Sequence, residues 1–373
     1  MNPTTDWPAL VEQLGTDFST RTAQHDEQDS FVAENYAALK AHGAFAAGVP
    51  GELGGGNASH AELCAMVRGL AAHCSSTGLA FSMHTHLVAA MAYLWRAGNK
   101  APEPMLRRVV DEQLVLVSSG GSDWLMGSGT MRKVDGGFRL SGRKIFSSGV
   151  PAGDVMLTTG VYDDPAAGPT VIHFPLSLRA EGVRVLDTWK VLGMRGTGSH
   201  DVEITDAFIP DAATGGVRRP VGKWHPFMHV VALVALPVIY AAYLGVAEHA
   251  RTRALQLASR KKDDPVLPIL VGEMENQFIT AQLAHADMVR MTASAKPGAD
   301  TTGAVLSRRT IVVNAVTSTV QKALEVAGGV GFYRNAGLER AFRDIQAARY
   351  HPIPEKSQTR LSGRLLMGLD IDG

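Results

Sequence analysis

The chain has 373 residues, of which 45% are hydrophobic and 19% are charged, and its 36 Lys and Arg residues balance 36 Asp and Glu residues. This length and composition are typical of a globular protein with two or three domains, and the balanced charge argues against nucleic acid or an anionic membrane as the main partner. The two cysteines, Cys64 and Cys74, form no disulfide framework, and no signal peptide is visible, so we expect a cytoplasmic protein.

The first block, residues 1–117, is expected to be a helical domain. Apolar residues recur at helical spacing in residues 31–40, 60–72 and 78–95. Residues 49–57 (VPGELGGGN) form a glycine-rich loop that no helix could cross.

The pattern changes at residue 118. Short segments rich in β-branched and aromatic residues and bounded by turn residues predict strands, at residues 136–142, 155–161, 169–175 and 201–210. We therefore expect a β domain over residues 118–218. Residues 219–373 return to helical spacing, which predicts helices at roughly 226–259, 265–295, 301–328 and 335–347.

One stretch, residues 227–246, is almost uncharged and is close to the length of a membrane span. It contains His229 and Pro237, and charged residues follow it at once. A lone span fits the rest of the chain badly, so we expect a helix buried on all sides within a helical bundle and no membrane span.

Two glycine-rich turns, residues 118–123 (SSGGSD) and 327–331 (AGGVG), are candidates for ligand binding. The chain has neither a P-loop motif nor a strand-linked Gly-x-Gly-x-x-Gly, so a Rossmann nucleotide site is unsupported. Glycines nevertheless let a backbone approach a ligand closely and direct its N–H groups at an anion.

Three motifs in this order carry a resemblance to a known family: residues 49–56 (VPGELGGG), residues 193–202 (GMRGTGSHDV) with 208–210 (FIP), and residues 327–332 (AGGVGF) with Arg343 and Asp344. Together they resemble the acyl-CoA dehydrogenase superfamily of flavoproteins. The resemblance implies an α+β fold with an N-terminal helical domain, a central β-barrel-like domain and a C-terminal four-helix bundle. It also implies FAD between the β domain and the bundle, in a homotetramer or homodimer.

The resemblance also assigns residues to the cofactor. Serines and a glycine in the turns at 118–122 and 146–148 would face the flavin ring, an arginine would reach the pyrophosphate, and a Gly-Gly pair would cover the phosphate–adenosine part from a neighbouring subunit. The residues concerned are Ser119, Gly121, Ser122, Ser147, Ser148, Arg260, Gly328 and Gly329. The family's Phe-Gly shortly after the arginine is replaced here by residues 261–264 (KKDD).

The main reading is an acyl-thioester dehydrogenase, with acyl-CoA as substrate and a separate electron acceptor. Such an enzyme removes a proton α to the thioester carbonyl with a carboxylate base, while the β-carbon gives hydride to the flavin. Counting from Asp344 puts Pro352 at the usual base position, and the alternative position on the first bundle helix falls near Ala235. Glu355, three residues late, is then the only visible candidate base, with His351 as substitute.

The alternative is a two-component flavin monooxygenase of the same superfamily, which uses reduced flavin from a reductase, O2 and a small aromatic or heterocyclic substrate. FMN is then possible as cofactor. Residues 146–149 (FSSG) and the position of His351 resemble that branch, and imidazole can act as a base near neutral pH. A third reading is a non-catalytic flavin-binding partner subunit.

His84 and His86 lie on a helix that borders the substrate pocket in this family. Two residues apart on a helix, their side chains diverge by about 200°, so at most one of them faces the pocket. We expect no metal site, because no further ligands accompany them in the sequence.

Overall fold

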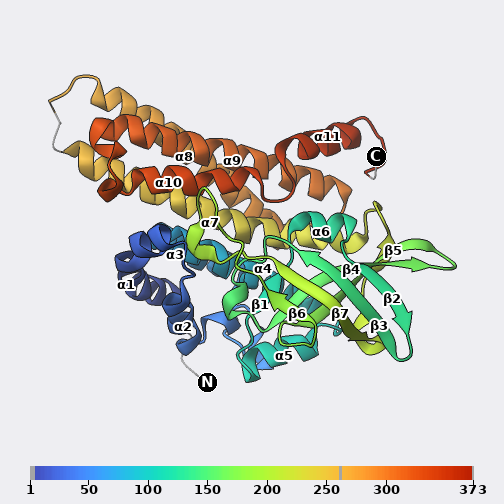
Figure 1. The fold of residues 1–373 in the computed structure, drawn as a ribbon. Helices are drawn as coiled ribbons and strands as arrows, with labels where there is room; N and C mark the ends of the chain where they lie inside the picture. The colour runs from blue at the N-terminus through green and yellow to red at the C-terminus, as the bar shows by residue number, and fades with distance from the viewer. Residues whose placement is uncertain (1–4, 260–262, 372–373) are drawn as a thin grey trace.

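The computed structural model describes residues 5–259 and 263–371. A helical N-terminal part, a central sheet and a helical C-terminal region follow one another along the chain (Figure 1), which confirms the predicted α+β fold. The N-terminal helices are α1 (Trp7–Gln28), α2 (Ala33–Ala41), α3 (His60–His73), α4 (Ser75–Arg96) and α5 (Glu103–Asp111).

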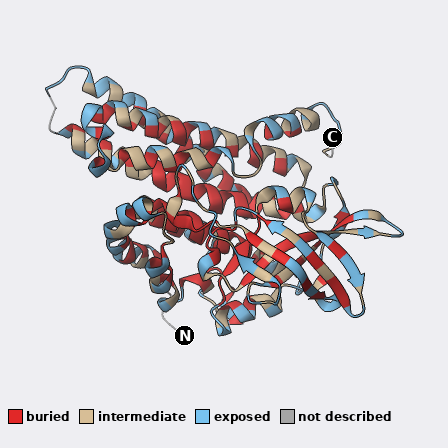
Figure 2. Cartoon of the chain, in the orientation of Figure 1, coloured by how far each residue is buried: buried red, intermediate tan, exposed pale blue. Residues whose placement is uncertain are grey.

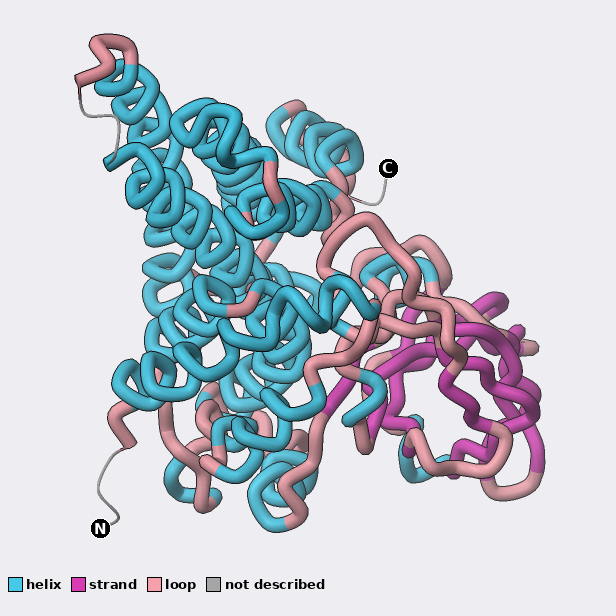
Figure 3. The backbone as a smooth tube through the Cα atoms, turned by 60° about the vertical axis from the view of Figure 1, so that its left-hand side comes forward, coloured by secondary structure: helices cyan, strands magenta, loops and turns pink. Residues whose placement is uncertain are grey.

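The central part is one mixed sheet, with strand order β6-β7-β3-β2-β4-β5-β8 and with β1 paired to β4. Figure 3 shows that this sheet curls back on itself. Its strands are β1 (Leu116–Ser118), β2 (Thr130–Val134), β3 (Gly137–Lys144), β4 (Val155–Asp164), β5 (Gly168–Ser177), β6 (Val183–Val185), β7 (Val202–Pro210) and β8 (Arg218–Pro220). The four predicted strands are observed as β3, β4, β5 and β7, whereas the four shorter ones were not predicted. Helix α6 (Gly121–Met126) follows β1.

The C-terminal region is built on long antiparallel helices. These are α7 (Pro226–Ala258), α8 (Leu267–Ser294) and α9 (Ala299–Ala327), followed by the shorter α10 (Leu338–Ile345) and α11 (Glu355–Leu366). Helix α7 has the length and hydropathy of a membrane span, yet 94% of its most apolar stretch is buried inside the protein. Figure 2 shows it as the continuous buried centre of the molecule. The prediction of a buried core helix is therefore confirmed.

Close packing around α7 requires a small residue where it meets α3. A Cβ atom added at Gly245 would lie 2.2 Å from the backbone oxygen of Arg68. A larger side chain there would push the two helices apart. The apolar sequence of α7 thus becomes a helix contacted on every side, since it forms the common surface for α3, α4, α8 and α9.

Pro237 stands inside α7 and has no N–H to donate to the carbonyl of Leu233. A hydroxyl from α8 replaces that donor, because Thr292 Oγ1 lies 2.8 Å from the Leu233 oxygen. Histidines satisfy two neighbouring carbonyls: His60 Nε2 lies 2.8 Å from the oxygen of Val234 and His285 Nε2 2.8 Å from that of Pro237. The buried proline is therefore accommodated by side chains of the surrounding helices.

Removing the Thr292 hydroxyl should show this compensation as lost stability. We expect Thr292→Val to lower the free energy of unfolding by about 1–3 kcal/mol, because the buried Leu233 carbonyl loses its partner. Thr280→Val, on the exposed side of the same helix, is the matched control, with a change of about 0.5 kcal/mol or less. Urea unfolding followed by circular dichroism measures both, and equal effects would contradict the assignment.

Candidate active site

A cavity of about 470 Å³ lies where the N-terminal helices, the sheet and α7 meet. Most of its lining is aliphatic or aromatic. The contributing segments are α4 between Leu79 and Met91, the turn 118–121 with Trp124, Phe146 and Ser148, the loop 189–194, α7 between Phe227 and Ile239, and residues 346–353. No Asp or Glu among the described residues lines it, and its one charged lining residue in that part of the chain is Arg343.

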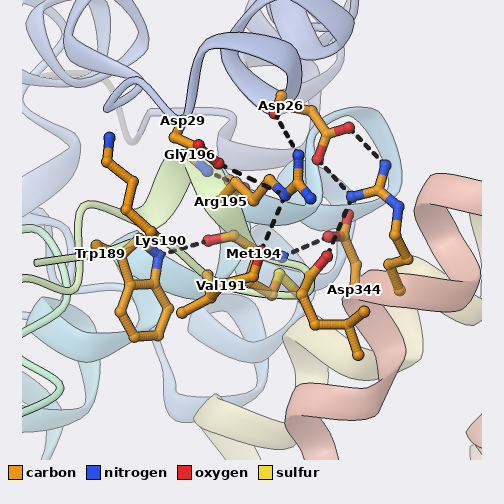
Figure 4. Close-up of polar contacts among 12 residues, drawn as sticks. Asp26, Asp29, Trp189, Lys190, Val191, Met194, Arg195, Gly196 and Asp344 are labelled. Atoms are coloured by element: carbon orange, nitrogen blue, oxygen red, sulfur yellow. Dashed lines mark hydrogen bonds and ion pairs between the residues drawn. The ribbon is translucent and has the colours of Figure 1, made fainter.

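The loop 189–194 is fixed to the C-terminal region by Asp344, which lies buried at the end of α10. Its carboxylate accepts hydrogen bonds from the backbone N–H of Met194, at 2.5 Å, and from the hydroxyl of Ser75 at the start of α4. Figure 4 shows this contact beside the loop. Burial raises the pKa of Asp344, although the two hydrogen bonds act in the opposite direction.

The preceding residue, Arg343, completes the junction. Its guanidinium donates to both carboxylate oxygens of Asp26 on α1, at 2.9 and 2.5 Å, and to the Leu192 carbonyl at 3.2 Å. Gly193 fits beneath α10 because a Cβ there would lie 2.4 Å from the backbone of Arg343. The Arg-Asp pair thus connects all three parts of the chain at one wall of the cavity.

Two lining residues have a backbone conformation that side chains rarely adopt. Phe146 and Met194 both have φ of +57°, in the left-handed region. The Phe146 ring is exposed at the cavity and packs edge-on against Trp189, with ring centres 6.0 Å apart. Such conformations persist where the surrounding structure enforces them, and they concentrate at functional sites.

A buried ion pair supports the serine turn from behind. Lys144 Nζ lies 2.9 Å from Asp123 Oδ1 and also donates to the carbonyl oxygens of Ser128 and Thr159, at 2.7 and 2.6 Å. Burial alone would raise the pKa of Asp123, but the Lys144 charge and hydrogen bonds outweigh it, so the pKa is lowered. The Ser119 hydroxyl donates to the same carboxylate. This pair therefore fixes the turn that lines the cavity.

Of the two helical histidines, His86 lines the cavity and His84 does not. His84 uses both ring nitrogens internally: Nδ1 accepts from the N–H of Leu116 at 2.9 Å, and Nε2 lies 2.8 Å from the oxygen of Phe45. It therefore connects α4 to β1 and to the segment before the glycine loop. Of the two histidines that the sequence suggests for the site, the structure therefore places His86 at the cavity and His84 away from it.

His351 also lines the cavity, in the segment that follows α10. Its Nδ1 lies 2.5 Å from the hydroxyl of Tyr243 on α7. Its carbonyl accepts from Arg309 Nη2 at 2.6 Å, and Arg309 Nε donates to Tyr240 Oη at 2.6 Å. Sequence reading did not find this supporting set, although two tyrosines and an arginine within apolar helices are signs of buried polar contacts.

The family follows from comparison with known proteins. Residues 12–103 match the acyl-CoA dehydrogenase N-terminal domain, and residues 229–355 match the acyl-CoA dehydrogenase C-terminal domain. The chain belongs to the acyl-CoA dehydrogenase superfamily. The family that the sequence motifs suggest is thereby confirmed.

Relatives within this superfamily differ in their named activities. A putative acyl-CoA dehydrogenase, YdbM of Bacillus subtilis (strain 168), is 27% identical over 93% of this chain and 92% of its own length. The pigment production hydroxylase of Rhodococcus sp. (strain ATCC 21145) is 25% identical over 97% of this chain and 96% of its own. Among further relatives, named monooxygenases and amino sugar nitrososynthases predominate.

A solved structure confirms the superfamily fold. KijD3, in complex with FMN and an amino-sugar nucleotide (dTDP-3-amino-2,3,6-trideoxy-4-keto-3-methyl-D-glucose), superposes with a TM-score of 0.88 at 23% identity. The match covers 100% of this chain and 96% of that one.

Several residues that the sequence assigned to the site lie elsewhere. Glu355 is the first residue of α11, pairs with Lys356 and does not line the cavity, although the sequence suggests it as the base. Ser122 is exposed, and Ser147 is buried behind the cavity wall, so neither lines the cavity.

The other residues that the sequence assigns to the cofactor include some that line the cavity and some that do not. Ser119, Gly121 and Ser148 line the cavity. Gly328 and Gly329 are exposed at the end of α9, away from it. Arg260 lies outside the described residues. No cluster of metal-ligating side chains occurs within residues 5–259 and 263–371.

Sequence reading missed the aromatic part of the lining. Trp124 and Phe227 stack with ring centres 6.1 Å apart, at an interplanar angle of 27°. They are a hundred residues apart in sequence, so only the fold brings them together. Ala235 and Pro352, the positions at which the sequence resemblance would put a base, do line the cavity.

The buried imidazoles make stability dependent on pH. Burial lowers the pKa to about 4 from the ordinary value of 6.5 in His84, His86, His173, His249, His285 and His351. The unfolded chain therefore binds protons first as the pH falls. We expect the free energy of unfolding to decrease from pH 6.5 towards pH 4.

His285→Gln should flatten this dependence by up to about 1.4 kcal/mol per pH unit, the equivalent of one proton. His42→Gln, at an exposed position, is the control and should leave the slope unchanged. Urea unfolding at a series of pH values measures the slope, and a slope unaffected by His285→Gln would contradict the assignment.

Proposed function

We propose that this protein is a flavin-dependent monooxygenase that acts on a small aromatic or heterocyclic molecule. One observation carries the proposal: the described lining of the cavity contains two imidazoles, His86 and His351, and no carboxylate. Thioester desaturation needs a carboxylate within reach of the α-carbon. The monooxygenases and hydroxylases among the relatives support the same choice.

The lining lacks a carboxylate base even at the two positions where the family resemblance would put one, because both positions belong to the described cavity wall. Ala235 on α7 and Pro352 after α10 both face the cavity, and neither side chain can accept a proton. The nearest candidate along the chain, Glu355, is directed to the surface and to Lys356. An acyl-thioester dehydrogenase, the main reading of the sequence, therefore has no carboxylate base in the described lining.

The residues present fit a flavin. Trp124 Nε1 is buried without a hydrogen-bond partner in the described parts of the chain, and Trp124 lines the cavity. The Phe146 ring and the hydroxyl of Ser148 stand at the same wall. Aromatic faces with a few polar edges suit a planar heteroaromatic ring. FMN or FAD would be held by these residues and by the turn containing Ser119 and Gly121.

When bound and reduced, the flavin would supply the two electrons with which O2 is activated. The chain itself contributes three things. The apolar walls from α4 and α7 exclude water. The aromatic side chains Trp124 and Phe227 orient a flat substrate. The imidazoles of His86 and His351 hold or move a proton at the substrate, as neutral histidines can at physiological pH.

Partners and location follow from the same proposal. A separate flavin reductase would supply the reduced flavin, as suggested by relatives named as oxygenase subunit or oxygenase component. Both cysteines are free and buried, which fits a reducing cytoplasm. We propose a homodimer or homotetramer, in which Gly328 and Gly329 would reach the flavin of a neighbouring subunit.

Turnover with reduced flavin tests the function directly. The purified protein should take up reduced FMN or FAD and, with O2 and a panel of phenols and indoles, should incorporate one atom of 18O from 18O2 into product. An acyl-CoA panel should not bleach the oxidised flavin under anaerobic conditions. Bleaching by an acyl-CoA without oxygen incorporation would overturn the proposal in favour of the dehydrogenase.

The two histidines should matter for turnover and Glu355 should not. We expect His86→Ala and His351→Ala each to reduce kcat by about 10²-fold or more, the usual contribution of a positioned acid or base. Flavin affinity, measured by fluorescence titration, should change little. Glu355→Gln is the control and should retain activity, whereas its inactivation would restore the carboxylate to the mechanism.

Exposed apolar side chains on α8 and α9 offer a place to test the proposed oligomer. Ile269, Ile279 and Leu283 on α8 and Ile311 on α9 are all exposed in the single chain. We expect Leu283→Asp to shift the mass measured by light scattering towards the monomer, because a buried charge at a subunit contact is unfavourable. Glu273→Asp on the same helix is the control. An unchanged mass for both variants would place the contact elsewhere.

A further inference from the structure

The two cavity histidines each have one ring nitrogen in an internal hydrogen bond, and that bond determines which nitrogen carries the proton. His86 Nδ1 lies 3.0 Å from the backbone oxygen of Ser82. A carbonyl oxygen can only accept, so Nδ1 of His86 carries the hydrogen. In a neutral ring, Nε2 of His86 is then a bare lone pair.

His351 has the opposite arrangement. Its Nδ1 is bonded to the hydroxyl of Tyr243, a fully buried residue of α7. Within the described residues, that hydroxyl has no other hydrogen-bond partner, so its hydrogen must point to Nδ1 or be left unpaired. A buried hydroxyl hydrogen without an acceptor is unfavourable. Tyr243 therefore donates, Nδ1 of His351 accepts, and the imidazole hydrogen is on Nε2.

The neighbouring tyrosine does not compete for this role. Tyr240 Oη accepts from Arg309 Nε at 2.6 Å and directs its own hydrogen at the carbonyl of His351, at 3.4 Å. Arg309 is fully buried and also donates to the carbonyl oxygens of Ala348 and His351, at 3.1 and 2.6 Å. Arg309 and Tyr240 are thus positioning residues that hold the main chain of His351 while Tyr243 sets its ring.

We propose that the cavity presents a complementary pair, a proton acceptor at Nε2 of His86 and a hydrogen-bond donor at Nε2 of His351. The pair selects a small ring that carries an O–H or N–H group. The O–H or N–H group of the substrate donates a hydrogen bond to Nε2 of His86. An oxygen atom of the substrate accepts a hydrogen bond from Nε2 of His351.

Both rings are neutral at physiological pH, as this assignment requires. Burial lowers the pKa of His86 and of His351 to about 4, and the positive charge of Arg309 acts in the same direction on His351. A protonated ring would present a donor on both sides, and the difference between the two histidines would vanish. The substrate class named here rests on the proposed function, whereas the tautomers do not.

Neutron diffraction from a deuterated crystal of the whole protein locates the hydrogens directly. We expect deuterium on Nδ1 and not on Nε2 of His86, and on Nε2 and not on Nδ1 of His351. His84 is an internal reference, because its contacts to Leu116 and Phe45 require deuterium on Nε2. Any other distribution on His86 or His351 overturns the proposal, whether or not the enzyme proves to be a monooxygenase.

A pair of probe ligands tests the same assignment in solution. Phenol can donate and accept a hydrogen bond, whereas anisole can only accept. Calorimetry should show phenol binding to the wild type about three- to tenfold more tightly than anisole, the value of one hydrogen bond. His86→Leu should abolish that preference. His351→Leu should weaken both ligands alike and keep the preference, and the reverse pattern would overturn the assignment.

Tyr243→Phe separates positioning from folding. Without the phenol hydroxyl, Nδ1 of His351 has no donor and its ring can carry the hydrogen on either nitrogen. We expect weaker binding of both probes, by about three- to tenfold, with an unchanged preference for phenol. Tyr36→Phe, at a buried tyrosine of α2 that does not line the cavity, is the matched control and should bind both probes as the wild type does. Equal loss in the two variants would overturn the role of Tyr243.

Discussion

The cavity depends on one junction, the consecutive residues Arg343 and Asp344. Their side chains reach Asp26 on α1, Ser75 on α4 and the backbone of the loop at Met194. A carboxylate with little contact with water needs donors, and the amide of Met194 and the hydroxyl of Ser75 meet that need. The same contacts hold Met194 in its left-handed conformation. The two residues therefore fix one wall of the cavity and also join the three parts of the chain.

The other walls depend on α7. Its sequence is apolar on all sides because helices surround it, and Pro237 is tolerated because Thr292, His60 and His285 supply hydrogen bonds. The same helix contributes Ala235 to the cavity and Tyr243 to His351. Core packing and site chemistry therefore share one element, which explains why so apolar a helix carries two tyrosines.

Much of the architecture was predictable from sequence, because the order of periodicities and the motifs around Gly193 and Arg343 are local signals. The position of His86 was predictable only as one of two, since helical spacing separates His84 from His86 without saying which faces inward. The place of Glu355 outside the cavity lining could not be predicted, because counting along the chain cannot show that Pro354 is the N-cap of a new helix that begins at Glu355. The roles of Arg309 and Tyr243 depend on contacts between α7, α9 and the segment after α10, which no single stretch of sequence contains.

The location of the Arg343–Asp344 junction has a consequence for biosynthesis. The cavity wall comprises residues of α4 and β1, which leave the ribosome early, but it is closed by Asp344 and His351, which leave it late. A nascent chain that has completed its helical and β parts still lacks the contacts that fix the loop at Met194. A ligand therefore gains its full binding site only after the residues up to Ile353 have been synthesised, so a chain that ends after the β part cannot hold it completely.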